Sequence, residues 1–205
     1  MNISLQNIGK RFNREWIFRH LHYEFVHGKS YAITGTNGSG KSTLLQVIAG
    51  ATLHSEGEIS FQGAKGSGQL AAEKIYENIA IAAPYLDLIE EMTALEFLQF
   101  HSSFKALTKP FAEILATVGL ANAANKQIRY YSSGMKQRLK LAQAFFSNTT
   151  VLLLDEPTTN LDEEGIVIYQ KLWSNYTTNK LVIVSSNDKI EFEKCEAVIS
   201  IVNYK

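Results

Sequence analysis

The sequence contains one cysteine and three prolines, and it has no excess of charge of either sign. Because Cys195 has no second cysteine to pair with, a disulfide within the chain is excluded, which fits a reducing compartment. We expect this thiol to pack as a small residue near the last helix. Lysines and arginines number 20, as do the acids, so no overall field attracts nucleic acid. We therefore expect protein partners chosen by local surfaces and no nucleic-acid partner.

The sequence also lacks a long hydrophobic run. No window approaches the roughly 18 unbroken apolar residues of a membrane span, and the first 16 residues have no apolar core of signal-peptide length. Hydrophobic residues make up 45% of the chain and charged residues 20%, a balance typical of globular proteins. We expect a soluble domain with one core and an insertion, which reaches a membrane only through a partner.

Short apolar segments alternate with helical patterns along the chain. Alternating apolar and polar residues in 3–26 predict strands joined by a turn near Asn13. Further strands are expected at 31–34, 57–63, within 75–84 before Pro84, 151–154, 181–186 and 197–202. Three- and four-residue spacing predicts helices at 42–50, over much of 93–146 and at 161–173. This order indicates an α/β fold with a parallel sheet covered on both faces.

The segment GTNGSGKST, residues 35–43, matches the P-loop pattern between a predicted strand and a helix. Glycine is needed at Gly35, Gly38 and Gly40 because loop amides must turn inwards around phosphate oxygens. Lys41 supplies a charge for the β and γ phosphates, and the Ser42 hydroxyl can bind Mg²⁺. The whole loop is predicted to bind nucleotide: Gly35, Thr36, Asn37, Gly38, Ser39, Gly40, Lys41, Ser42 and Thr43.

A second motif, VLLLDEP, places two acids after a buried strand. Asp155 and Glu156 then lie at the carboxyl end of the sheet, where open α/β sheets bind ligands. We expect Asp155 to join Ser42 in the Mg²⁺ site and Glu156 to act as the base for the attacking water. Taken alone, the segment could also be a strand ended by solvated acids. With the P-loop it predicts a P-loop NTPase, with a nucleotide kinase or a GTPase still possible.

Three further segments carry a resemblance to a known family. YSSGM (131–135) continues as KQRLKLAQAFF, and the acidic strand continues as DEPTTNLD. Over about 3–202 the chain resembles the nucleotide-binding domain of an ATP-binding cassette (ABC) protein. The resemblance implies a single domain, 1–205, with a RecA-like core. An N-terminal antiparallel β subdomain and the P-loop part of the core would occupy 1–84, an inserted α-helical subdomain 85–147, and the rest of the core 148–205.

The resemblance also implies roles for particular residues. Two such domains would dimerise head to tail and enclose ATP between the Gly35 loop of one and the Ser132 and Gly134 segment of the other. Ser132 equally fits a helix N-cap. The segment Asn160 to Asp162 resembles the loop that communicates between protomers. Phe12 stands where the family stacks an aromatic ring on adenine, with Trp16 a second candidate, and Phe12 in the core of a strand pair is the alternative.

Two positions depart from the family pattern. Counting back from Thr93, the position of the Mg²⁺-linked glutamine is Pro84, with Tyr85 and Asp87 close by. Asn187 stands where a histidine normally contacts the γ-phosphate, and an asparagine cannot relay a proton. We include Asn187 among the catalytic candidates with Lys41 and Glu156. ATP binding should survive both changes, whereas hydrolysis is expected to be slow or dependent on a partner.

These features predict the ATPase subunit of an ABC transporter. The subunit would be cytoplasmic and peripheral on the inner face of the cell membrane, and would drive a polytopic permease that docks around Pro84 to Met92. A nucleotide-gated regulatory module or the degenerate half of a heterodimer is the alternative, motivated by Pro84 and Asn187. A cassette ATPase acting on ribosomes or DNA finds less support because the chain has no basic surface run. A P-loop kinase finds less support because DEPTTNLD and YSSGM would have no role in it.

Overall fold

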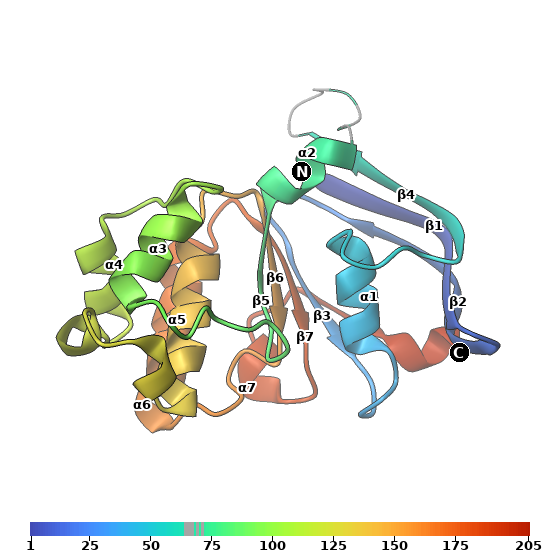
Figure 1. Ribbon diagram of the computed structural model, residues 1–205. Coiled ribbons are helices and arrows are strands. Elements are labelled where there is room, and N and C mark those ends of the chain that lie inside the picture. The colour runs from blue at the N-terminus through green and yellow to red at the C-terminus, as the bar shows by residue number, and fades with distance from the viewer. Residues whose placement is uncertain (64–67, 69, 71) are drawn as a thin grey trace.

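The fold consists of two sheets with one helix between them (Figure 1). The computed structural model describes residues 1–63, 68, 70 and 72–205. The strands in chain order are β1 Asn2–Phe12, β2 Glu15–Phe25, β3 Ser30–Thr34, β4 Glu56–Gln62, β5 Ile79–Ala82, β6 Val151–Asp155, β7 Leu181–Ser185 and β8 Ala197–Ser200. The helices are α1 Lys41–Ile48, α2 Ala72–Asn78, α3 Ala94–Ser102, α4 Phe111–Thr117, α5 Ser133–Phe146, α6 Glu163–Tyr176 and α7 Lys189–Phe192.

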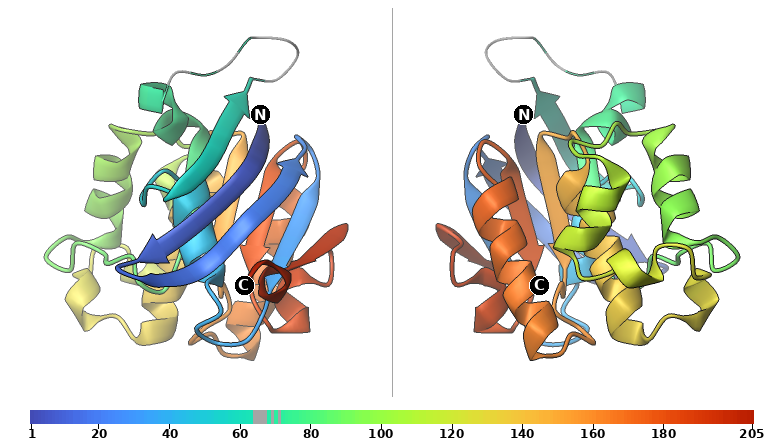
Figure 2. Two further views of the ribbon diagram at one scale, coloured as in Figure 1. Left: turned by 90° about the vertical axis from the view of Figure 1, so that its right-hand side faces the viewer. Right: turned by 90° about the vertical axis from the view of Figure 1, so that its left-hand side faces the viewer.

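The first sheet is antiparallel, in the order β2-β1-β4. Its two N-terminal strands form the predicted hairpin, with Phe12 opposite Glu15 and with Asn13 at a φ of 53° in the turn. Asparagine tolerates this left-handed conformation because its short polar side chain bonds locally. The left view of Figure 2 shows this sheet in front of α1. The predicted N-terminal antiparallel β subdomain is therefore confirmed.

The second sheet is parallel, in the order β5-β6-β7-β3-β8. All five residues of β6 and all five of β7 are buried, as expected for parallel strands with both faces covered. Since every strand runs the same way, β3, β6 and β7 end at one edge. That edge gathers the loops that carry both predicted motifs.

Apolar clusters cover both faces of the parallel sheet. On one face, α1 fills the space between the sheets, where Leu44 and Ile48 pack with Ile33, Phe18 and other core residues. On the other face, α3, α4, α5 and α6 form a helical layer (Figure 2, right). The α/β core with its parallel sheet is therefore as predicted. The helical layer draws α3, α4 and α5 from residues 94–146 and α6 from residues 163–176.

Element boundaries differ from the predictions in three places. The strand expected within 75–84 is only β5, because the preceding residues form α2. The helical block after Thr93 divides into α3, α4 and α5, with Pro110 at the N-cap of α4. The last strand ends at Ser200 and continues as a 3-10 turn over Ile201–Tyr204. The longest helices, α5 and α6, have 14 residues each, and within the described ranges none is long and apolar enough to span a bilayer.

Candidate functional site

The phosphate loop connects β3 to α1 and takes backbone conformations that require glycine. Gly35, Gly38 and Gly40 have φ values of 152°, 75° and 104°. A Cβ at Gly40 would lie 2.5 Å from Ile17 Cγ2, and one at Gly35 would lie 2.6 Å from Ser39 Oγ. The loop surrounds a pocket of about 210 Å³. Its lining residues are Ile17, Asn37, Gly38, Ser39, Gly40, Lys41, Ser42, Thr43 and Glu156. Seven of the nine predicted loop residues thus meet at one cavity.

Lys41 is folded onto the loop and is only 5% exposed. Its Nζ donates to the carbonyl oxygens of Gly35 at 2.8 Å and Thr36 at 3.4 Å. These contacts hold the ammonium group inside the ring of loop amides, at the N-terminus of α1. A buried cation that only carbonyl dipoles satisfy still favours an anion nearby, and phosphate oxygens supply one.

Asp155 ends β6 beside this loop and is 2% exposed. Burial raises its pKa, while the nearby Ser42 and Ser185 hydroxyls oppose that shift. Its Oδ1 is buried and has no hydrogen-bond partner among residues 1–63, 68, 70 and 72–205. A buried carboxylate oxygen without a partner is costly. Since Mg²⁺ takes carboxylate and hydroxyl oxygens together with phosphate oxygens, Asp155 and Ser42 fit such an ion.

Glu156 follows in a strained conformation, with φ at 41°. Its amide donates to the Ser185 carbonyl at 2.9 Å, which fixes the turn at the sheet edge. A left-handed backbone conformation lowers stability by about 1–3 kcal/mol in a residue other than glycine, and it is often found at active sites. Glu156 lines the phosphate pocket and also a neighbouring pocket of about 310 Å³. Glu156 therefore belongs to the lining of both spaces.

Asn187 lies beside the phosphate loop, as the sequence predicted. Its Oδ1 accepts a hydrogen bond from the Gly35 amide at 3.1 Å, and its Nδ2 lies 3.5 Å from Asn37 Oδ1. Asn187 also lines the 310 Å³ pocket with Glu156. This bond joins the segment after β7 to the phosphate loop, which leads into the catalytic candidate Lys41.

Glu191 is a buried acid of this region that the sequence did not single out. It is 4% exposed, and its Oε1 accepts bonds from the Thr158 amide and Oγ1, both at 2.6 Å. Burial raises its pKa, and bonds from Ser186 and Thr158 oppose that change. Glu191 therefore ties the segment after Glu156 to α7. A single glutamate on a four-residue helix gives no periodic signal that could have revealed it.

The YSSGM segment begins α5 and packs against the loop after β6. The Ser132 hydroxyl accepts from the Met135 amide at 3.2 Å, so Ser132 is the predicted N-cap. A Cβ on Gly134 would lie 2.9 Å from the Asn160 carbonyl oxygen. Gln137, 3% exposed, donates from Nε2 to the Pro157 carbonyl at 2.8 Å. Neither Ser132 nor Gly134 is among the residues that line the phosphate pocket, so this single chain leaves the segment apart from it.

The two aromatic candidates lie near the β1–β2 turn. Phe12 is 49% exposed with Lys10 Nζ 4.6 Å from its ring centre. The alternative that placed Phe12 in the core of a strand pair is therefore wrong, because Phe12 is the last residue of β1 and faces solvent. Trp16 carries the guanidinium groups of Arg11 and Arg19 at 5.4 and 4.1 Å. The Phe12 ring is half exposed to solvent, whereas the Trp16 ring is covered by two arginines. Ile17 supplies an apolar part of the wall of the phosphate pocket.

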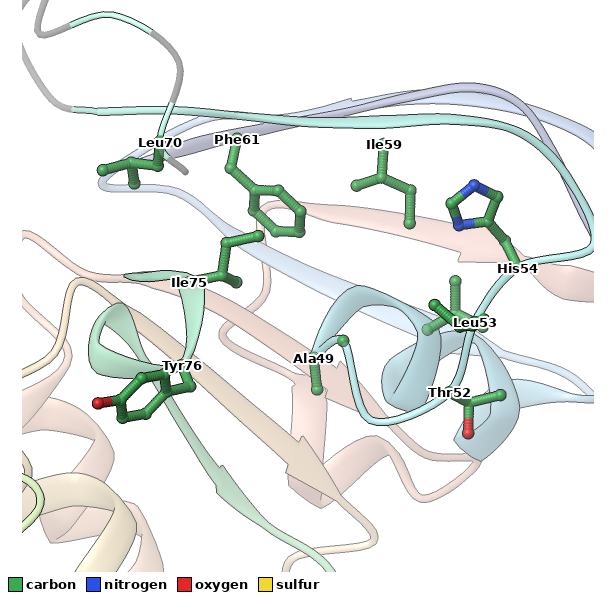
Figure 3. A pocket seen from close by; sticks show the side chains of 11 residues that line it. Ala49, Thr52, Leu53, His54, Ile59, Phe61, Leu70, Ile75 and Tyr76 are labelled. Carbon is green, nitrogen blue, oxygen red and sulfur yellow. The ribbon is translucent and has the colours of Figure 1, made fainter. Parts of the chain in front are cut away.

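Figure 3 shows a larger pocket of about 400 Å³ on another side of α1. Its walls are mainly apolar and come from the end of α1, from β4 and from α2; among them are Ala49, Ile59, Phe61 and Ile75. Thr52, at its edge, donates from Oγ1 to Gln46 Oε1 at 3.3 Å. Among the described residues that line it there is no lysine or arginine, so this part of the wall gives phosphate no strong cationic partner.

The chain is similar to a known protein family and to curated bacterial proteins. The family described as ABC transporter matches residues 18–159. The uncharacterized ABC transporter ATP-binding protein YybJ of Bacillus subtilis (strain 168) is 30% identical over 196 residues, which covers 91% of this chain and 86% of the relative. The cytochrome c biogenesis ATP-binding export protein CcmA of Vibrio vulnificus (strain YJ016) is 28% identical over 185 residues, 89% of each chain.

Solved structures show the same fold. The ATP-binding cassette MJ0796, determined as a dimer bound to ADP and Pi, has a TM-score of 0.79 at 24% identity over 97% of this chain and 93% of its own. An ATP-binding subunit of an ABC transporter gives 0.83 at 20% identity over 98% and 85%. With the phosphate loop, the acidic strand and the YSSGM helix in place, the chain belongs to the ABC transporter family as an ATP-binding domain.

Proposed function

We propose that this chain binds MgATP in the Gly35–Thr43 pocket and hydrolyses it to drive a polytopic membrane permease. The observation that carries the proposal is the corner formed by the buried Lys41 ammonium and the unpartnered Oδ1 of Asp155. Among the described residues, Lys41 Nζ donates only to loop carbonyls and Asp155 Oδ1 has no hydrogen-bond partner. Phosphate oxygens and a metal would supply the missing opposite charges. Asp155 and Ser42 would hold Mg²⁺, which when bound offsets negative charge on the phosphate oxygens.

The hydrolytic step follows from the residues around that corner. The oxygen of a water attacks the γ-phosphorus, the bond to the β–γ bridging oxygen breaks, and ADP and phosphate result. Glu156 would orient that water and accept its proton, as its place between the two pockets allows. Asn187 would hold the segment after β7 against the loop through the Gly35 amide. Lys41 would offset charge on the β and γ oxygens.

We further propose that two copies, or this chain and a related one, close head to tail around the nucleotide. Ser132 and Gly134 would then approach the γ-phosphate held by the partner's loop, and Asn160 to Asp162 would lie between protomers. The dimeric form described for MJ0796 supports this arrangement. The chain would bind on the inner face of the cell membrane through a permease that contacts residues 84–92.

Phosphate release and membrane association test this function together. Wild type and Glu156→Gln, each isolated from membranes with any permease that co-purifies, are assayed for phosphate release from ATP. We expect the substitution to lower the rate at least 100-fold, in line with loss of a general base, while ATP binding remains. Equal and negligible rates would favour the regulatory module or degenerate heterodimer half that Pro84 and Asn187 suggest. Absence of any permease complex would contradict the transport role.

A further inference from the structure

Glu156 and Asn187 line a common pocket but come from different segments of the chain. The pocket is the one of about 310 Å³ beside the phosphate loop. Glu156 directly follows β6, whereas Asn187 lies between β7 and α7. The helix α7 lies at the edge of the parallel sheet where β6 and β7 end (Figure 1). Because the two side chains stand on separate turns, their relative position depends on contacts between those turns.

The turn after Glu156 is held by two helices. From α5, Gln137 donates from Nε2 to the Pro157 carbonyl at 2.8 Å. From α7, Glu191 accepts on Oε1 from both the amide and the Oγ1 of Thr158, each at 2.6 Å. Thr158 and Glu191 also line the same pocket as Glu156. The turn therefore has one anchor on each side, and the anchor from α7 is a single carboxylate.

The helix α7 also fixes the segment that carries Asn187. The Glu191 amide donates to the Asp188 carbonyl at 3.1 Å, and the Asp188 amide donates to Ser186 Oγ at 2.8 Å. Asn187 lies between Ser186 and Asp188, and its Oδ1 accepts from the Gly35 amide at 3.1 Å. The backbone of Glu191 thus belongs to the turn of Asn187, while its side chain reaches the turn after β6.

The connection made by Glu191 is buried. The residue is 4% exposed, so loss of its bonds to Thr158 would leave polar groups unpaired away from solvent. The nearby Ser186 hydroxyl opposes the rise in the pKa of this carboxyl that burial causes. Oε2 nevertheless makes no hydrogen bond to any residue in the described ranges. The connection between the two turns therefore depends on Oε1.

We propose that Glu191 is a positioning residue for ATP hydrolysis, which through Thr158 holds Glu156 in place relative to Asn187. Glu191 is not among the residues that line the phosphate pocket, so it acts through these residues and not on the nucleotide. Displacement of a catalytic group by about 1 Å can lower a rate about 100-fold, whereas the loop amides that bind phosphate stay in place. This inference rests on the proposed function, since it requires hydrolysis at Glu156.

Phosphate release and ATP calorimetry, on proteins isolated in the same way as for the hydrolysis assay, test this role. Glu191→Met keeps the length of the side chain but removes both oxygens, so kcat should fall about 10- to 100-fold. KM and ATP affinity should stay within about twofold, because the phosphate loop is unchanged. Glu191→Gln keeps an oxygen that can accept both Thr158 bonds, and its amide nitrogen would take the place of Oε2. Its kcat should remain within about threefold of wild type.

Thr158→Val is a second variant, which removes the Oγ1 bond and leaves the amide bond. Its kcat should fall about 3- to 10-fold, the effect of one hydrogen bond. Glu193→Met, the same change at an exposed position just after α7, is the matched control and should alter neither rate nor affinity. Tyr169→Phe removes the bond from the phenol to the Glu191 carbonyl at 2.6 Å, so it should lower the unfolding midpoint but not kcat.

Circular dichroism at the assay temperature establishes that each variant is folded, and Thr158→Val decides if Glu191→Met is not. An unchanged kcat in Glu191→Met or in Thr158→Val would overturn the role of Glu191 and leave the proposed function intact. Equal losses in Glu191→Gln and Glu191→Met would do the same, as would an equal loss in Tyr169→Phe, because the stability of α7 would then set the rate. A wild type that releases no phosphate from ATP would instead contradict the hydrolysis on which both proposals depend.

Discussion

The phosphate loop and the rim around it, defined as residues 84–92 and Asn187, meet different physical demands. The loop binds through backbone amides, so its glycine positions cannot vary, and a Cβ at Gly40 would meet Ile17 at 2.5 Å. The rim acts through side chains on turns, where Asn187 still reaches the Gly35 amide at 3.1 Å. The comparison leads us to propose that nucleotide binding depends mainly on the loop, and that the rim would set the rate and coupling of hydrolysis.

Among the substitutions that test this comparison, the largest effect is expected at Asp155, the acid beside the phosphate loop. Asp155→Asn removes a charged ligand worth about 1.5–3 kcal/mol, so the Mg²⁺-dependent gain in ATP affinity should fall about 10- to 100-fold. Calorimetry with Mg²⁺ and with EDTA measures this gain. Asp87→Asn, an exposed acid of the rim, is the matched control. An unchanged Mg²⁺ effect in Asp155→Asn would place the metal elsewhere.

The same substitution should stabilise the nucleotide-free protein. Burial raises the pKa of Asp155 in the folded protein above its value in the unfolded chain. The protonated carboxyl therefore favours the folded state at low pH. This stabilisation is complete below the unfolded pKa and is lost as pH rises through the folded pKa. At pH 7 the wild type buries an ionised carboxylate, which lowers the free energy of unfolding, and Asp155→Asn buries a neutral amide instead. Thermal unfolding should show a higher midpoint for the variant at pH 7 and a smaller difference at pH 4. A lower midpoint at pH 7 would contradict the cost assigned to this carboxylate.

A smaller effect is expected at Asn187, where the rim departs from the family pattern. Asn187→His restores a ring that can carry a proton, so phosphate release should rise about tenfold, a modest share of general acid–base effects. ATP affinity should change less than about twofold, because the loop amides are intact. Steady-state phosphate release and calorimetry measure the two quantities. Asn148→His, on an exposed loop, should leave both unchanged, and an increase in affinity without an increase in rate would reverse the division between loop and rim.

The adenine contact is expected to contribute less again. Phe12→Ala should weaken ATP binding about 3- to 10-fold, the range expected for one aromatic stack. The affinity for inorganic tripolyphosphate should not change, since that molecule has no base. Trp16→Ala provides the comparison, because arginines already cover that ring. Loss of affinity in the tryptophan variant alone would assign the stacking role to Trp16.

The smallest effect concerns stability at the far end of the sheet. Lys180 precedes β7, donates to the Ser147 carbonyl at 2.8 Å, and has a pKa lowered to about 8 by burial. Since the unfolded lysine holds its proton up to about pH 10.5, wild type should gain stability as pH rises from 8 to 10. Urea unfolding should show no such gain in Lys180→Met. ATP affinity should be equal in both, and a shift in affinity would connect the two ends of the sheet.

The sequence predicted those parts of the fold that repeat a simple pattern. Continuous apolar runs such as Leu181–Ser185 predict buried parallel strands, and the glycines of residues 35–43 predict a loop that only glycine can form. The predicted order of strand, loop and helix was therefore correct. Lys41, Asp155 and Glu156 could be predicted as site candidates because each occupies a fixed position next to such a pattern.

Other features depend on contacts between distant segments and gave no local signal. Glu191 meets Thr158 across 33 positions, and Lys140 meets Pro84 across 56. The short α2 helix was missed because seven residues give too little periodicity to separate it from β5. The exposure of Phe12 depends on where β1 ends, and strand ends are the least certain feature of a sequence pattern.

The most direct test of the account is calorimetry of purified wild type and Lys41→Ala with ATP and Mg²⁺. Loss of the buried ammonium removes charge-assisted bonds to two phosphates, so affinity should fall at least about 100-fold while circular dichroism stays unchanged. Heat of binding in wild type that disappears in Lys41→Ala is the predicted result. No ATP binding by the folded wild type, or equal binding by both proteins, would contradict a nucleotide site in this loop.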